Sequence, residues 1–181
     1  SSDLKLNGNL KKNKNQGTSI LSDFKLTGSL IIKSVMVIFL VVYLGRLYVS
    51  DYAADVSMDK ISAALEQVSG VTDLSEPGVS GLRRFYQIDE NDIDSYFFRK
   101  AASPMSVDEV LVVKANSSSE ASAYLEAAQA HLESQKNIFE GYGTDQMALL
   151  GEASVEKRGA YVWYFCGENA QELRQALLSM I

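Results

Sequence analysis

The residues that most often carry cross-links, metals or catalysis are scarce in this sequence. Its 181 residues include one cysteine (Cys166), one histidine (His131) and two prolines. A single cysteine can form neither an internal disulfide nor the paired thiolates of a structural zinc site, so packing alone must hold the fold together. Because Cys166 lies far downstream, we also expect no lipid-modified cysteine as an anchor.

Catalytic and cofactor motifs are equally scarce. His131 lies in the middle of a predicted helix, at the margin of its apolar stripe, and we interpret it as a half-buried packing residue rather than a catalytic base. The acidic cluster at residues 89–94 lacks the order of a calcium loop and is interpreted as a solvated turn. Gly141-Tyr142-Gly143 follows a helix instead of opening one after a strand, unlike a phosphate loop. The sequence therefore predicts no metal, no cofactor and no catalytic residue.

One long apolar run is present, LIIKSVMVIFLVVYLGRLYV at residues 30–49. At about 1.5 Å per residue it spans about 30 Å, the thickness of a bilayer core. Lys33 and Arg46 lie near its ends, where long side chains reach the headgroups. The run predicts one transmembrane helix. Lys33 and Ser34, the polar residues within it, would mark the side that faces a protein partner.

A cleaved signal peptide is the alternative interpretation of this run. The uncharged part, residues 34–45, has the length of a signal-peptide core. Arg46 follows that part directly, a long basic tail precedes it, and no small-x-small cleavage site stands at the right distance. We therefore favour a permanent anchor.

Charge is divided unevenly between the two sides of the apolar run. Residues 1–50 hold 7 Lys/Arg and 2 Asp/Glu, a net of +5, whereas residues 51–181 hold 10 and 21, a net of −11. The positive-inside bias places the N-terminus in the cytoplasm and the C-terminal domain outside the cell membrane. A domain this acidic is unsuited to nucleic acid, which requires clustered Lys and Arg.

Composition divides the chain further. Residues 1–29 form a basic cytoplasmic tail, rich in Asn, Lys, Gly and Ser, that we expect to be mostly disordered. Within it DLKLNGNL (3–10) returns as DFKLTGSL (23–30), which is either a duplicated docking peptide or, as we favour, chance similarity. Residues 50–74 should form a juxtamembrane amphipathic helix and linker, and residues 75–181 the extracytoplasmic domain.

Periodicity predicts the elements of the outer part. Apolar spacing of three and four residues indicates helices, and alternating or continuous apolar runs indicate strands. Helices are expected at 57–68, around 82–86, and at 118–138, 144–150 and 168–180; strands are expected at 93–99, 107–115, 153–157 and 160–166, the last two joined by a hairpin at Arg158-Gly159. This order predicts an α+β domain with an antiparallel sheet of about four strands, covered on one face by helices.

The break between two of these helices, Phe139-Glu140-Gly141-Tyr142-Gly143, is the most unusual local feature. It is either an exposed binding loop with Tyr142 as an anchor, or, as we favour, a helix end at which the glycines turn the chain and the aromatic residues fix the loop to the core. Under the first interpretation the candidate partner- or ligand-binding residues are Phe139, Glu140, Tyr142 and Gln146.

Three segments taken together resemble a known family. MSVDEVLVVK (105–114), Gln135-Lys136 followed by FEGYG (139–143), and GAYV (159–162) resemble a family of uncharacterised extracytoplasmic domains from Gram-positive lipoproteins and single-pass membrane proteins. The resemblance covers about residues 75–180 and implies an α+β fold and an envelope location. It supplies no catalytic residues. It also implies a membrane-bound O-acyltransferase as a possible partner.

These observations favour a membrane-anchored, non-enzymatic accessory or interaction protein of the bacterial cell envelope. Its outer domain would bind a membrane-protein partner or an envelope polymer. The alternative is an envelope hydrolase or transferase that uses carboxylates near the 139–143 loop.

Overall fold

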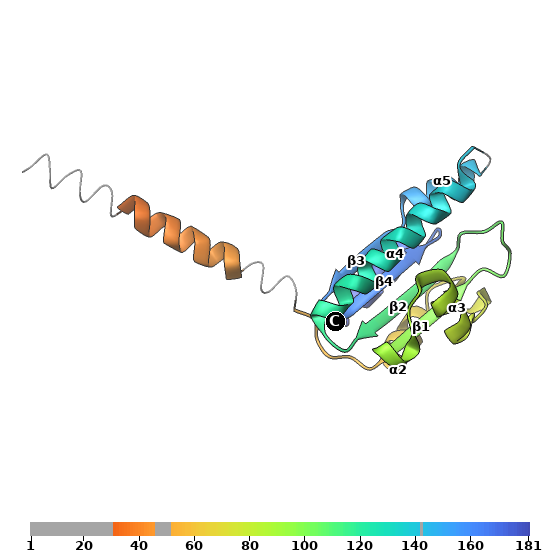
Figure 1. The fold of residues 1–181 in the computed structure, drawn as a ribbon, viewed down its shortest axis with the longest axis horizontal. Coiled ribbons are helices and arrows are strands. Elements are labelled where there is room, and N and C mark those ends of the chain that lie inside the picture. Colours follow the sequence, from red (N-terminus) through yellow and green to blue (C-terminus); the bar gives the residue numbers. More distant parts are fainter. Residues whose placement is uncertain (1–30, 46–51, 142) are drawn as a thin grey trace, which may run out of the picture. The chain divides into compact units, whose positions relative to one another are not determined.

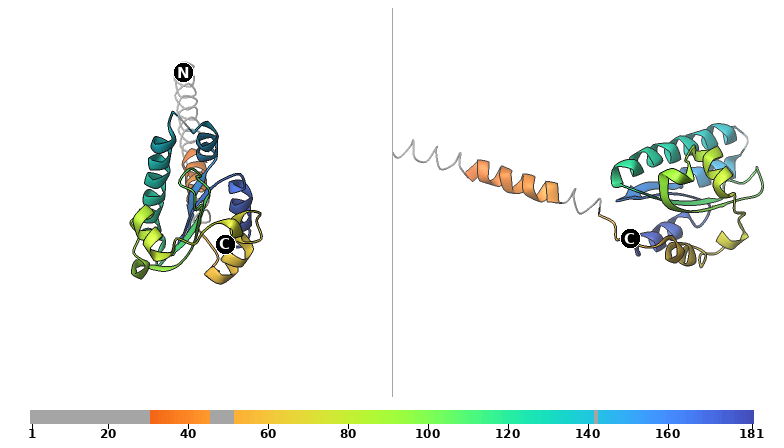
Figure 2. Two further views of the ribbon diagram at one scale, coloured as in Figure 1. Left: turned by 90° about the vertical axis from the view of Figure 1, so that its right-hand side faces the viewer. Right: turned by 60° about the horizontal axis from the view of Figure 1, so that its bottom comes forward.

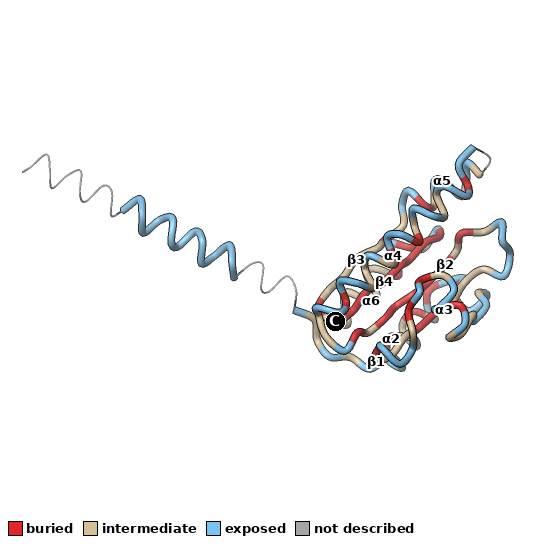
Figure 3. The backbone as a smooth tube through the Cα atoms, in the orientation of Figure 1, coloured by how far each residue is buried: buried red, intermediate tan, exposed pale blue. Residues whose placement is uncertain are grey.

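The computed structural model describes residues 31–45, 52–141 and 143–181, and the chain divides into two units, Ser1–Ser50 and Asp51–Ile181. In the first unit residues 31–45 form a helix in which every residue is exposed (Figure 3). The predicted tail (1–29) and the two ends of the predicted span lie outside the described residues. No helix within the described ranges is both long and apolar enough to cross a membrane.

The second unit is built on a four-stranded antiparallel sheet with the order β1-β2-β4-β3 (Figure 1). The strands are β1 (Ile93–Lys100), β2 (Glu109–Ala115), β3 (Ser154–Arg158) and β4 (Tyr161–Cys166). The two central strands are those whose sequences are apolar on both faces, because a central strand is covered on both sides. The predicted α+β class and the four antiparallel strands are confirmed.

The hairpin between β3 and β4 forms where the sequence predicts it. Gly159 has a φ of 56°, in the left-handed region that glycine adopts without steric cost. The turn pairs Arg158 with Tyr161 and sets the register of the edge strand. Alternation along β4 is also as expected: Tyr161, Trp163 and Phe165 lie in one hydrophobic cluster, and Val162, Tyr164 and Cys166 in the other.

Helices cover both faces of the sheet, as the edge-on view in Figure 2 shows. The first face contacts α3 (Gly78–Tyr86), α4 (Ser118–Phe139) and α5 (Thr144–Gly151), and the second contacts α2 (Met58–Leu65) and α6 (Ala170–Leu178). The expectation of a single covered face is therefore wrong. With Trp163 and Phe165 on the second face, leaving that face in water would expose a large apolar area. Two short 3₁₀ helices, η1 (Val71–Asp73) and η2 (Glu90–Asp92), complete the elements.

The segment that enters the second unit is held against the sheet. Arg158 Nε donates to the Tyr52 carbonyl at 2.9 Å, and Lys114 pairs with Asp55 at 2.8 Å. The Tyr161 hydroxyl accepts from the Val56 amide at 2.8 Å and donates to the Val56 carbonyl at 2.7 Å. Hydrogen bonding to Asp55 raises the pKa of Lys114 to about 12. These contacts make residues 52–56 part of the domain surface.

Helix α2 then continues into the core. Ile61 and Leu65 are fully buried in the second cluster, alongside residues of β4 and α6. The segment expected to be a juxtamembrane helix and linker before residue 75 thus supplies part of the hydrophobic core, and the unit begins at residue 51.

Candidate functional site

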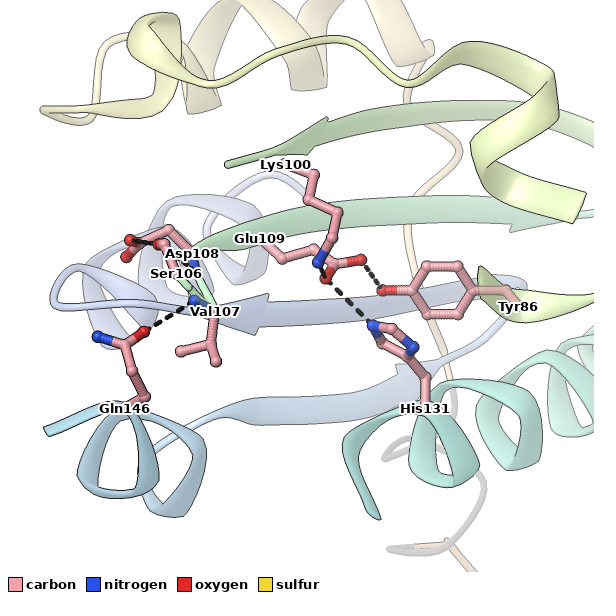
Figure 4. Close-up of polar contacts among 8 residues, drawn as sticks. All are labelled: Tyr86, Lys100, Ser106, Val107, Asp108, Glu109, His131 and Gln146. Atoms are coloured by element: carbon pink, nitrogen blue, oxygen red, sulfur yellow. Dashed lines mark hydrogen bonds and ion pairs between the residues drawn. The ribbon is translucent and has the colours of Figure 1, made fainter. Parts of the chain in front are cut away.

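A buried carboxylate, Glu109, lies at the start of the central strand β2. Its side chain is 1% exposed, on the first face of the sheet. An ionised carboxylate in such a place is costly unless charged and hydrogen-bonding partners surround it. The geometry around Glu109 supplies those partners, and they come from three different elements (Figure 4).

Three donors converge on this carboxylate. The Tyr86 hydroxyl, at the end of α3, donates to Oε1 at 2.6 Å. His131 Nε2, from α4, lies 3.1 Å from Oε2, and the Lys100 ammonium, at the end of β1, pairs with the same oxygen. We call these four residues the Glu109 cluster.

Different structural features position the partners of Glu109. Lys100 is the direct cross-strand partner of Glu109 in the β1–β2 register, so their side chains project from the same face. The His131 ring packs against Tyr86 and Tyr164, with centroid separations of 4.6 and 5.3 Å, which fixes its orientation. Aromatic packing and strand pairing together position the cluster.

Burial and hydrogen-bonding partners determine the protonation states of Glu109 and Tyr86. Burial raises the pKa of Glu109, but the hydrogen bond and charge of His131 and the Lys100 ammonium oppose it, and the net result is a pKa below the usual value. Burial, followed by the charge of Glu109, raises the pKa of the Tyr86 hydroxyl well above its ordinary value. Glu109 is thus held as a carboxylate, and Tyr86 as a neutral donor.

Cys166 and Tyr164, which lie near the Glu109 cluster, provide no reactive group. Burial is the main cause that raises the pKa of Cys166 to about 12, so this thiol is a small buried hydrophobe, as the sequence predicted. The Tyr164 hydroxyl is buried and forms no hydrogen bond of ordinary geometry within the described residues; the Cys166 thiol is its weakly polar neighbour.

Two open hollows flank the cluster. A groove of about 720 Å³ between α3 and α4 is lined by residues that include Tyr86, Tyr124 and His131. A cleft of about 520 Å³, formed by α3, the loop after β1 and the end of α4, is lined by residues that include Lys100 and Phe139. Arg84 and Phe85 line both. The cluster is therefore reached from the surface through His131 on one side and Lys100 on the other.

The predicted binding residues of the 139–143 segment occupy different environments. Phe139 is buried in the first hydrophobic cluster, whereas Glu140 is exposed. Gln146, on α5, accepts a hydrogen bond from the Val107 amide at 2.9 Å and so fixes the entry to β2. Tyr142 lies outside the described residues, and Gly141 has a left-handed φ of 89°. Phe139 and Gln146 thus have structural contacts.

The other residues singled out in the sequence lie elsewhere. Lys33 and Ser34 are exposed on helix 31–45. In the acidic turn, Asp89 accepts from the Asn91 amide at 3.1 Å and pairs with Arg83 at 2.6 Å. Throughout the described part of the chain, no three His, Cys, Asp or Glu side chains converge as metal ligands.

His131 is buried and hydrogen-bonded to Glu109, whereas the sequence predicted a half-buried residue that only packs. The available signal was Glu109 itself: a glutamate beside the continuous apolar run of a central strand faces the interior and requires a cation. The identity of that cation depends on strand register and helix placement, which periodicity does not specify.

We expect acid to weaken the domain through Glu109. The pKa of an unfolded-chain glutamate is about 4.3, and the folded-state pKa of Glu109 is lowered. Because the unfolded state takes up the proton more readily, the contribution of Glu109 to the free energy of unfolding is complete above about pH 4.3 and is lost as the pH falls through the folded-state value.

Urea titrations of the full chain in mild detergent, from about pH 7 down to about pH 3, should therefore show a steeper loss of stability than in Glu109→Gln. Asp89, Asp94 and Glu156, whose pKa values are also lowered, remain in both proteins, so the difference isolates Glu109. Parallel stability curves would contradict this assignment.

Comparison with known proteins places the domain in a family. No curated protein and no solved structure matches the chain. A protein family described as a domain of unknown function, DUF4358, matches residues 67–167, which include α3, α4, α5 and the whole sheet with its Glu109 cluster. The chain therefore belongs to the DUF4358 family.

Proposed function

We propose that this protein is a membrane-anchored, non-enzymatic accessory or interaction protein of the bacterial cell envelope. Residues 30–49 anchor it in the cell membrane, with the N-terminus in the cytoplasm and the domain of residues 51–181 outside. The domain binds a membrane-protein partner or an envelope polymer, and a membrane-bound O-acyltransferase is the candidate partner. The family to which the chain belongs is a domain of unknown function and assigns no activity to the domain.

The observation that carries the proposal is the exposure of helix 31–45. Its large apolar side chains are between 53% (Leu44) and 73% (Phe39) exposed. A contiguous apolar surface of this kind is unfavourable in water and requires an apolar environment or a partner. In the sequence the apolar run continues to residue 49, which gives the length that a bilayer requires.

The contacts of the Glu109 cluster support a non-enzymatic role. All three donors around the carboxylate are directed at it, which is how a buried charge is stabilised. His131 Nε2 in particular is directed at Glu109 at 3.1 Å, so the ring serves as a partner of the buried carboxylate.

An enzyme is the second candidate, and one observation favours it. His131 lines the 720 Å³ groove while Glu109 binds its Nε2, and a carboxylate-oriented imidazole facing a groove is an arrangement that general bases use. Carboxylates near the 139–143 loop are the other candidate groups; of these, Glu140 is exposed.

Anchoring and partner binding can be tested together with a photo-crosslinking residue in helix 31–45. At about 100° per residue, position 37 lies on the same side as Lys33 and Ser34, and position 39 lies opposite. We expect the full chain to stay in the membrane pellet after an alkaline wash. We also expect it to form a discrete protein adduct from Val37 but only lipid adducts from Phe39.

A C-terminal tag in the same cells shows on which side of the membrane the domain lies. External protease should remove the tag, and an unanchored chain in the supernatant would refute the anchor. Equal protein adducts from positions 37 and 39, or none from either, would refute a partner that recognises the polar side of the helix.

A further inference from the structure

The cleft beside Lys100 has a charge opposite to that of the domain that contains it. Its lining includes two cations, Arg84 and Lys100, and the described residues that line it include no aspartate or glutamate. The surrounding unit, residues 51–181, has a net charge of −11. A cationic hollow on an acidic domain needs a specific explanation, because overall composition works against it.

Arg84 is the less constrained of the two cations. It is exposed, and its guanidinium lies 5.4 Å from the centroid of the Phe85 ring. Among the described residues no carboxylate pairs with it, whereas its neighbour Arg83 pairs with Asp89 at 2.6 Å. Stacking on Phe85 holds the guanidinium beside the cleft and leaves its donors available to a ligand.

Lys100 supplies ammonium donors from the wall of the cleft. Its ammonium lies 5.2 Å from the centroid of the same Phe85 ring, and its side chain is 15% exposed. An ammonium has three donors, and Glu109 takes one of them. The pairing to Glu109 fixes the position of Lys100. The Phe85 ring thus lies against one cationic side chain from α3, Arg84, and one from β1, Lys100.

Among the described residues, two with unpaired backbone amides also line this cleft. Ala102 and Ser103, in the loop after β1, line the cleft, and their backbone amides make no hydrogen bond within the described chain. A volume of about 520 Å³ falls within the range typical of small-molecule sites. Guanidinium, ammonium and free amides around one hollow are the donors that proteins use for phosphate.

We propose that the cleft between Arg84 and Lys100 binds a phosphate group of a ligand. Arg84 provides the guanidinium fork and a positive charge that is unpaired among the described residues. Lys100, which is paired with Glu109, provides further ammonium donors, and Phe85 lies against both cationic side chains. The phosphate belongs either to a soluble phosphate ester or to the headgroup of an anionic phospholipid. This site does not depend on the partner or the anchor proposed above, because it is formed within residues 75–139.

Calorimetric titration of inorganic phosphate into the full chain in non-ionic detergent, at constant ionic strength, tests the site. We expect saturable binding that Arg84→Gln weakens about tenfold or more, the equivalent of losing one charge-assisted hydrogen bond. Arg83→Gln is the matched control and should leave the affinity unchanged, because Arg83 already pairs with Asp89. The unfolding midpoint, followed by Trp163 fluorescence, confirms that both variants are folded.

A competition arm separates the two sources of phosphate. Displacement of bound phosphate by short-chain phosphatidylglycerol, but not by short-chain phosphatidylcholine, would support the site and assign a lipid headgroup. Displacement by glycerol phosphate but by neither lipid would support the site and assign a soluble ester. No saturable binding, equal weakening in both arginine variants, or equal binding of chloride would overturn the proposal.

Discussion

Replacing Glu109 with alanine should lower the free energy of unfolding by about 3–5 kcal/mol. Glu109 is the acceptor for Tyr86, Lys100 and His131, and its removal leaves the partly buried Lys100 ammonium and the buried side chains of Tyr86 and His131 without their partner. The penalty is largely that of the unpaired groups, which have already lost their water. Since whole domains are stable by about 5–15 kcal/mol, this one change removes a large share of the total.

The measurement is a urea titration of the full chain in mild detergent, followed by the fluorescence of Trp163. This tryptophan is the only one in the sequence and is buried in the second cluster, so it reports on the core. Glu133→Ala is the matched control: this glutamate is 65% exposed and pairs with Lys136 on the surface of α4. The control should cost less than about 0.5 kcal/mol. Equal losses in the two variants would show that the cluster contributes no more than a surface ion pair.

Ile61→Ala should cost about 2–5 kcal/mol, the range for a fully buried aliphatic side chain. Ile61 lies on α2 and is 0% exposed, against the face of the sheet that carries Trp163 and Phe165. The substitution removes three carbon atoms and leaves a cavity that rigid neighbours fill only in part. This result would establish that α2 belongs to the cooperative domain.

Lys60→Ala is the control in the same helix, because Lys60 is exposed and makes no ion pair among the described residues. Alanine is also the better helix former, so little change is expected there. Urea titrations in the same detergent give both values. If Ile61→Ala matched Lys60→Ala, α2 would be a linker that rests on the domain without stabilising it, and the domain would begin near residue 75.

Several features of the fold could be predicted because they are local. The strand at 161–166 alternates two aromatic sets, and the sheet places those sets in separate clusters. The long helix at 118–139 follows from its apolar spacing and from the Ser117 hydroxyl that accepts from the Glu120 amide at 3.3 Å. Gly159 marks the hairpin because few other residues adopt its backbone angle at low cost.

The candidate site could not be predicted in the same way. In the sequence, Glu109 and Lys100 each lie near an end of a predicted strand, and His131 lies at the margin of the apolar stripe of a predicted helix. Their convergence requires the β1–β2 register, which pairs Lys100 with Glu109. It also requires that α4 pack on the sheet so that His131 lies within hydrogen-bonding distance of Glu109. The second covered face could not be predicted for a related reason. The apolar stripe of α2 indicates that this helix is buried, but it does not indicate which surface of the domain the helix packs against.

The sequence by itself determined the main helices and strands of the domain, their order, the antiparallel sheet of about four strands, and the opposite charges of residues 1–50 and 51–181. These follow from interactions between residues close in the chain, or from composition. Only the tertiary structure decided that helices cover both faces, that α2 belongs to the core, and that Glu109 is hydrogen-bonded to residues 9 and 22 positions away. A buried charge is stable only where separate elements bring its partners within hydrogen-bonding distance, and that requirement is met in space rather than along the chain.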